Sequence, residues 1–172
     1  MRFVAYGASE RVFGWVRLQA DRLTDLLNGH AVLLLTDAEV EDLEHGTTRS
    51  AHEVQIRTRD LVAVHASGPR GAEALRRRTR SHPVAIRAGS YLVGGHLHAP
   101  PGDEPLTSLR DRPPMVPLTD AWIEYWSGGV RTKHATGTII VNRDLADWVR
   151  VVTDEELLDG VLGPPAVDSQ TA

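Results

Sequence analysis

Four aspartates occupy matching places in two similar stretches and are the first candidates for acid–base chemistry. Asp37 lies in LTDAEVED and Asp120 in LTDAWIEY, while Asp60 and Asp144 each follow an arginine. Paired carboxylates can serve as general acid and general base. A single active site needs only one pair, whereas a residue that shapes a turn is needed in every copy of a fold. We therefore interpret these aspartates as structural and predict no catalytic residue.

Two histidines, His96 and His98, alternate along a predicted strand and so project from one face of it. The chain has no cysteine, so any metal would depend on histidine and carboxylate ligands. His134 is the nearest third ligand by topology. The first-half positions that match the two histidines are Trp15 and Arg17, which bind no metal. We predict no metal site and no cofactor, and keep a metal-dependent hydrolase using His96 and His98 as the third hypothesis.

An arginine-rich segment joins the two halves of the chain at residues 67–82. Arginine forks bind phosphate well, so nucleic-acid or nucleotide binding through this segment is our second hypothesis. The net charge of −4 gives no overall attraction to nucleic acid. A solvated linker or bridging helix is the simpler interpretation. The candidate phosphate-binding residues are Arg76, Arg77, Arg78 and Arg80.

Two tryptophans, Trp122 and Trp126, are predicted to lie on one face of a strand over residues 116–126. Tryptophan is enriched at protein interfaces. We expect one or two of the four tryptophans in the core, and any left outside to mark a partner-binding surface. Trp122 and Trp126 are the candidates for that surface.

An internal repeat organises the whole chain. At an offset of 81 residues Ser9, Val12 and Gly14 match Ser90, Val93 and Gly95, and at an offset of 83 the two LTDA segments match. At an offset of 84 the IRTRDL segment meets IVNRDL. Blocks in the same order, with small insertions between them, indicate a duplication.

Each half reads as a hairpin, a short helix and further strands, about five strands in all. We predict a first small β domain over residues 1–66, the linker over 67–82, a second β domain over 83–152, and a short acidic helix with a disordered tail over 153–172. Closing such a short sheet into a barrel removes its exposed edges. The predicted fold is therefore mainly β, with two tandem small barrels.

The pattern of each half resembles the Sm-like small barrel. The likeness rests on the glycine in the second strand, the LTDA segments, and the closing IRTRDLVAV and IVNRDLADWV. The chain also resembles bacterial, in particular actinobacterial, proteins of unknown function that carry V-x-G, LTD and VNRD blocks. The glycine of the last Sm motif is replaced by Arg59 and Arg143, and the uridine pocket has no counterpart. The resemblance therefore implies the fold and carries no RNA-binding residues over.

Composition favours a folded, soluble protein, with 41% hydrophobic and 24% charged residues. No stretch is apolar enough to cross a membrane or to act as a signal peptide, so a cytoplasmic location is expected. Nearly all basic residues are arginine, which is typical of a GC-rich bacterial genome. Our first hypothesis is a non-enzymatic interaction or regulatory module that binds a protein partner or associates with itself.

Overall fold

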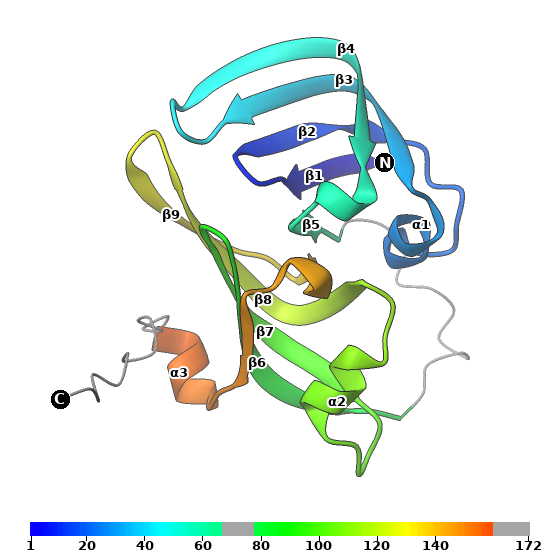
Figure 1. Cartoon of the computed structure of the whole chain (residues 1–172), viewed down its shortest axis with the longest axis vertical. Helices are drawn as coiled ribbons and strands as arrows, with labels where there is room; N and C mark the ends of the chain where they lie inside the picture. Colours follow the sequence, from blue (N-terminus) through cyan, green and yellow to red (C-terminus); the bar gives the residue numbers. More distant parts are fainter. Residues whose placement is uncertain (67–77, 160–172) are drawn as a thin grey trace, which may run out of the picture.

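The computed structural model describes residues 1–66 and 78–159 and is mainly β (Figure 1). The first half contains strands β1 (Arg2–Tyr6), β2 (Glu10–Val16), β3 (Val32–Asp42), β4 (Thr47–Arg57) and β5 (Ala63–His65), with helix α1 (Leu23–Gly29). The second half contains β6 (Arg80–Ala88), β7 (Tyr91–Ala99), β8 (Met115–Ser127), β9 (Val130–Ala135), β10 (Thr138–Asn142) and β11 (Trp148–Val151), with helices α2 (Pro105–Arg110) and α3 (Asp154–Asp159). Short 3-10 turns precede β5 and β11 at Thr58–Asp60 and Arg143–Leu145.

All of these strands form one antiparallel sheet, which corrects the prediction of two closed barrels. Its order is β11-β6-β7-β8-β10-β5-β1-β2-β3-β4, and β9 is a further partner of β8. The halves share the sheet because β5 pairs with β10, through His65 opposite Ile139 and Ala63 opposite Val141. The sheet is not closed, and β11 and β4 are its two end strands. The closed barrels were predicted wrongly because β5 and β10 use their free edges to pair with each other, whereas a closed barrel would have paired those edges within each half.

The elements follow the same order in the two halves, and one bulge recurs in detail. Pairing of β2 with β3 is irregular at Gly14, and pairing of β7 with β8 at Gly95. Beside these glycines, Asp37 and Asp120 have φ values of 48° and 46°, the left-handed region in which Asp is tolerated better than most residues. A Cβ on Gly95 would lie 3.0 Å from two side chains, so the close approach of the strands requires glycine there.

The 3-10 turns and the strands that follow them match between the halves at a different offset from the one predicted from the sequence. The 3-10 turns begin at Thr58 and Arg143, and β5 and β11 pair with their neighbours through Ala63 and Trp148. The two residues of each pair are 85 positions apart in the chain. Arg59 therefore matches Asp144 in space, and the apparent alignment of the two Arg-Asp pairs was wrong by one residue.

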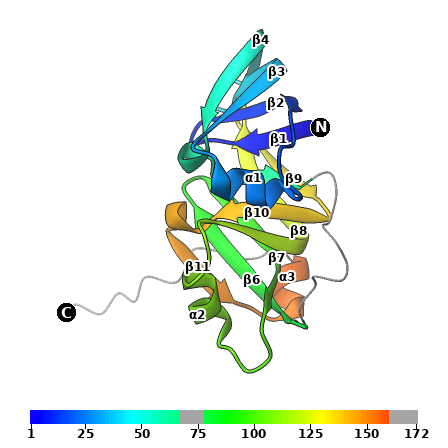
Figure 2. The same ribbon diagram turned by 90° about the vertical axis from the view of Figure 1, so that its right-hand side faces the viewer.

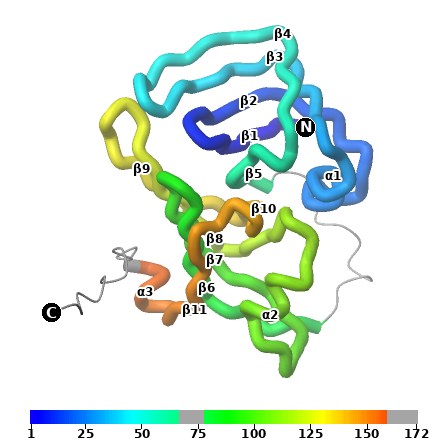
Figure 3. Tube along the Cα trace, in the orientation of Figure 1, coloured from blue at the N-terminus to red at the C-terminus, as the bar shows by residue number. Residues whose placement is uncertain are grey.

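Further contacts at both ends of the interface hold the halves together besides the β5–β10 pair. The Asn28 side chain at the end of α1 exchanges two 3.0 Å hydrogen bonds with the backbone of Met115 in β8. At the other end of the interface the β3–β4 and β8–β9 turns meet, where Gly128 N donates to Leu43 O at 2.9 Å. The β9 arm reaches from the second half toward this turn (Figures 1 and 3).

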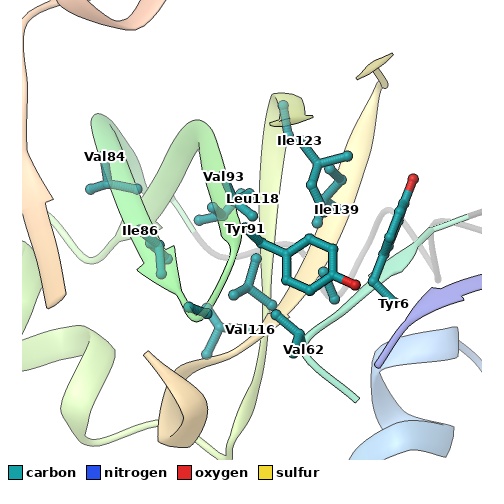
Figure 4. Close-up of a cluster of buried hydrophobic side chains, with 14 of the residues drawn as sticks. Tyr6, Val62, Val84, Ile86, Tyr91, Val93, Val116, Leu118, Ile123 and Ile139 are labelled. Atoms are coloured by element: carbon teal, nitrogen blue, oxygen red, sulfur yellow. The ribbon is translucent and has the colours of Figure 1, made fainter. Parts of the chain in front are cut away.

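Buried apolar side chains form two main clusters, one in each half, and both clusters include residues of the other half. The cluster of the second half contains Tyr6 and Val62 from the first half, and Tyr91 points toward Tyr6 within it (Figure 4). The cluster of the first half likewise contains Met115 and Ile140. The halves thus complete each other's cores.

The segment boundaries differ from prediction at two places. Strand β6 begins at Arg80, so the last residues assigned to the linker belong to the sheet, and Figure 2 shows β6 and β7 running together below α1. The short acidic helix after residue 152 is present as α3, whose Leu157 is buried. None of the helices in the described part of the chain is long and apolar enough to span a membrane.

Candidate functional site

Three tyrosines from different strands meet where the two halves face each other. The ring centroid of Tyr6 lies 5.6 Å from that of Tyr91 and 5.2 Å from that of Tyr125, and all three side chains are buried. Aromatic pairs at these separations are mutually stabilising. The Tyr91 hydroxyl donates to the carbonyl oxygen of Gly7 across the interface at 2.7 Å. These rings form a rigid floor under a group of polar side chains.

Arg11 on β2 is the central polar residue of this region. Its guanidinium bonds Glu41 through Nε at 2.8 Å and Nη2 at 2.6 Å, and its Nη1 donates to the hydroxyl of Tyr125. The Cζ atom lies 4.5 Å above the Phe13 ring, a cation–π contact. Glu41 in turn accepts a 2.7 Å hydrogen bond from Ser127 of the second half. Arg11 is therefore held in one orientation by groups from both halves.

Burial sets the protonation of the groups around Arg11. It lowers the pKa of His65 to about 4, with the charges of His134 and Arg11 acting in the same direction. It also raises the pKa of the Tyr6 hydroxyl well above its usual value, and the nearby Tyr125 adds to this. His65 is thus neutral and Tyr6 protonated at pH 7, and Tyr6 can donate to His65 Nε2 at 2.9 Å.

His134 on β9 completes the group, which we call the Arg11 cluster: Tyr6, Arg11, Glu41, His65, Tyr125 and His134. The Nε2 atom of His134 lies 3.1 Å from the Tyr125 hydroxyl and 3.3 Å from Arg11 Nη1. The cluster offers hydrogen-bond donors and one fixed cation. Burial raises the pKa of both of its hydroxyl groups, those of Tyr6 and Tyr125.

The four aspartates interpreted as structural lie outside this cluster, and each has a basic neighbour. Asp37 and Asp120 occupy the bulges of β3 and β8, where the backbone conformation accounts for their presence. Their carboxylates lie 3.7 Å from His52 and 3.9 Å from His96. Asp60 and Asp144 are exposed and lie beside their preceding arginines, with N–O distances of 3.6 Å and 3.1 Å. These are the surroundings of surface ion pairs.

His96 and His98 do lie on the same strand, β7, but they take different partners. His98 Nε2 lies 2.8 Å from the Thr119 hydroxyl, and His96 Nε2 lies 3.2 Å from Asp154. His134, the suggested third ligand, belongs to the Arg11 cluster instead. Among the described residues no group of three His, Asp or Glu side chains could hold a metal ion.

The structure describes only part of the arginine segment. Arg76 and Arg77 lie outside the described residues, while Arg78 and Arg80 are both exposed. Arg80 is the first residue of β6 and pairs with Ala99. At least this arginine is therefore part of the sheet.

The two tryptophans separate into one core and one surface residue. Trp122 is 6% exposed, packs with Leu157 of α3 and donates from Nε1 to the Leu157 carbonyl oxygen at 3.0 Å. Trp126 is 57% exposed, and Trp15 is comparably exposed on β2. Of the two predicted partner-binding residues, only Trp126 presents its ring to solvent. The strand pattern alone gave no sign that a helix after the second half would bury Trp122.

Sequence reasoning missed the Arg11 cluster because its members are single residues spread over both halves. One signal was present: the positions that match Tyr6 and Arg11 in the second half hold Arg87 and Leu92, so this pair of side chains is not repeated. No protein-family model matches the chain, and neither the curated proteins nor the solved structures include a significant match. The fold and site define a mainly β protein with one open antiparallel sheet.

Proposed function

We propose that the protein is a non-enzymatic interaction module that associates with further copies of itself through the ends of its sheet. The observation that carries the proposal is a difference in exposure between two matching residues. Val32 begins β3 and is 49% exposed, whereas Met115 begins β8 and is 3% exposed. Both precede the LTDA segment by the same number of residues. The surface around Met115 is therefore buried in the second half, while the matching surface around Val32 in the first half is exposed to solvent.

The proposal treats the halves as copies of one small, Sm-like unit. Three observations support this: the two halves share an order of elements, the bulge at Gly14 recurs at Gly95, and the 3-10 turns and the strands after them are separated by the same offset. On this view β11 is the counterpart of β5, and β4 is the counterpart of β9 and β10 together. The β5–β10 joint inside the chain is then one instance of a contact that the unit can repeat.

The free ends of the sheet carry the two surfaces of that contact. Strand β4 is an end strand with eleven residues, and an exposed edge of this length readily adds another strand. Beside it Leu34 is exposed, as is Val32, while Ile56 is half-buried. Strand β11 ends the sheet on the other side. Pairing β11 of one copy with β4 of the next would cover these apolar side chains.

The internal joint also supplies the register of the contact between copies. His65 lies opposite Ile139 and Ala63 opposite Val141. At the 85-residue offset, Arg150 and Trp148 of β11 are the counterparts of His65 and Ala63, and Val54 and Ile56 of β4 are the counterparts of Ile139 and Val141. The contact between copies therefore places Arg150 of one copy opposite Val54 of the next, and Trp148 opposite Ile56. Because each copy then offers a different end to each neighbour, the contact is head-to-tail and extends beyond a dimer.

Sedimentation analysis of purified protein over a range of concentrations tests this function. Unmodified protein should form species larger than a dimer, and Val32→Glu should shift it toward monomer because a charge would be buried in the joint. Val130→Glu is the matched control, since Val130 is also an exposed valine but lies on the β9 arm. A monomer at every concentration, or an equal effect of both variants, would reject self-association.

A further inference from the structure

A hollow of about 360 Å³ lies between β1, β2 and β5 of the first half and the β9 arm of the second. This volume is in the range of small-molecule sites. Its wall combines two kinds of side chain: apolar ones from Val4 and Phe13, and polar ones from Tyr6, Arg11, His65 and His134.

The polar groups of the wall are mainly hydrogen-bond donors, of which Tyr6 already donates to His65 and Arg11 to Glu41 and Tyr125. Arg11 is a fixed cation, Arg2 adds a second guanidinium, and no carboxylate belongs to the described wall. Glu41, which bonds Arg11, approaches it from β3 outside that wall. The imidazole of His65 is neutral at pH 7 because of its burial, so it adds a donor without a charge. Such a wall accepts an anion and disfavours a cation.

The hollow has no counterpart in the described part of the second half, although the strands that form it do. Val4 pairs with Phe13, just as Ala85 pairs with Gly94. Over Gly94 the matching face is filled, because a Cβ there would lie 2.4 Å from the Trp122 ring and 2.7 Å from Leu157. In the first half the matching face carries Phe13 and remains open as the hollow.

This difference between halves favours a role in binding. A group that stabilises the fold of the unit would serve both halves, and the second half uses apolar packing from Trp122 and α3 for that purpose. In the first half, Arg11 stands where the second half has the buried Leu92. A guanidinium in place of leucine costs desolvation, which the bonds of Arg11 to Glu41 and Tyr125 offset in part.

We propose that this hollow binds a small aromatic monocarboxylate. The carboxylate lies by Arg11 and the imidazoles of His65 and His134, where charge-assisted hydrogen bonds are available. The ring lies against Phe13 and Val4. The Tyr6 hydroxyl, which also lines the hollow, is already engaged with His65.

The experiment is a titration of isotope-labelled protein, followed by nuclear magnetic resonance, with benzoate, phenylacetate and 3-phenylpropionate. At least one should give saturable shifts at Phe13 and at the Arg11 guanidinium, and its primary amide should bind at least about tenfold more weakly. Shifts at neither residue with all three acids up to about 10 mM, or equal binding of acid and amide, would overturn the proposal.

Two variants locate the binding. Val4→Phe adds an apolar ring that fills the hollow and should abolish the shifts, while Val130→Phe, on the exposed end of β9, should leave them unchanged. Should Val4→Phe fail to fold, the double variant Arg11→Met with Glu41→Gln removes both charges of the half-buried pair together. It should weaken binding of the acid by about tenfold or more and leave binding of the amide unchanged. Unaltered binding of the acid in these variants would contradict the assignment.

Discussion

Arg11 and Tyr125 are 114 residues apart in the sequence and hydrogen-bonded in the structure. The guanidinium belongs to β2 of the first half and the hydroxyl to β8 of the second. This contact and the 2.9 Å hydrogen bond from Gly128 N to Leu43 O join the two halves at the end of the interface opposite the β5–β10 pair. Arg11 and His65 also line the hollow on the face of β1 and β2.

Tyr125→Phe should destabilise the protein by about 1 to 2 kcal/mol. The variant keeps the ring in the core but removes the acceptor of the Arg11 hydrogen bond, which is to a charged group. Urea unfolding monitored by circular dichroism measures the change in free energy. Trp126→Phe is the control, because Trp126 is adjacent but exposed, and we expect less than about 0.5 kcal/mol for it. Equal effects of the two variants would show that the bond to Arg11 contributes nothing.

Gly94→Ala should be destabilising by about 1 to 3 kcal/mol, because the added methyl group overlaps the Trp122 ring and Leu157. Either α3 must leave the sheet or the ring must move. Tryptophan fluorescence and thermal unfolding report both effects. The control is Gly137→Ala, where nothing lies within 4 Å of the new Cβ. A Gly94 variant as stable as this control would mean that Trp122 and Leu157 do not pack over Gly94 as described.

Stability should fall as the pH is lowered from about 6.5 to about 4, in part because of His65. Its folded pKa of about 4 is below the ordinary value of 6.5, so the unfolded chain binds the proton first in this interval. The contribution is fully present above pH 6.5 and is lost as the pH falls toward 4. The groups facing His65 are Tyr6, Arg11 and His134.

The variant His65→Phe isolates this contribution, since a ring is kept and the titrating group is removed. Urea unfolding at pH 7 and at pH 5 should show a smaller loss of stability in the variant than in the unmodified protein. Other groups whose pKa values shift, such as His98, are common to both proteins and cancel in the comparison. The same pH slope in both would contradict the lowered pKa of His65.

Local pattern predicted the mainly β character, the opening hairpins and the acidic helix, because strand alternation and turn residues act over a few positions. The two LTDA aspartates were interpreted as structural, and they lie with Gly14 and Gly95 at the two bulges, which gives the physical reason. Closure of the sheet was predicted wrongly, since which edges pair depends on contacts between distant strands. Neither the sequence of β5 nor that of β10 indicates by itself that these two strands pair.

The candidate site could not be predicted from the sequence, for a related reason. Arg11, His65 and His134 come from three strands and are brought together only by the way the halves pack. Tryptophans attracted attention by residue type, yet whether each is buried depends on neighbours: α3 covers Trp122, and nothing in the described chain covers Trp126 to the same extent. Under the predicted repeat, the useful signal is a position at which the two halves differ: Arg11 matches Leu92.

The central claim, that β11 of one copy adds to β4 of the next, is tested most directly by disulfide trapping, because the chain has no cysteine of its own. Two proteins are mixed and oxidised, one carrying Val54→Cys and the other Arg150→Cys. These positions match Ile139 and His65, which lie directly opposite each other within the chain. Directly opposed residues on antiparallel strands approach closely enough for a disulfide after small adjustment. A covalent heterodimer should form rapidly, while Val54→Cys mixed with Leu158→Cys, an exposed position on α3, should give none. Failure of the first pair to cross-link, or equal cross-linking of both pairs, would contradict the proposed assembly.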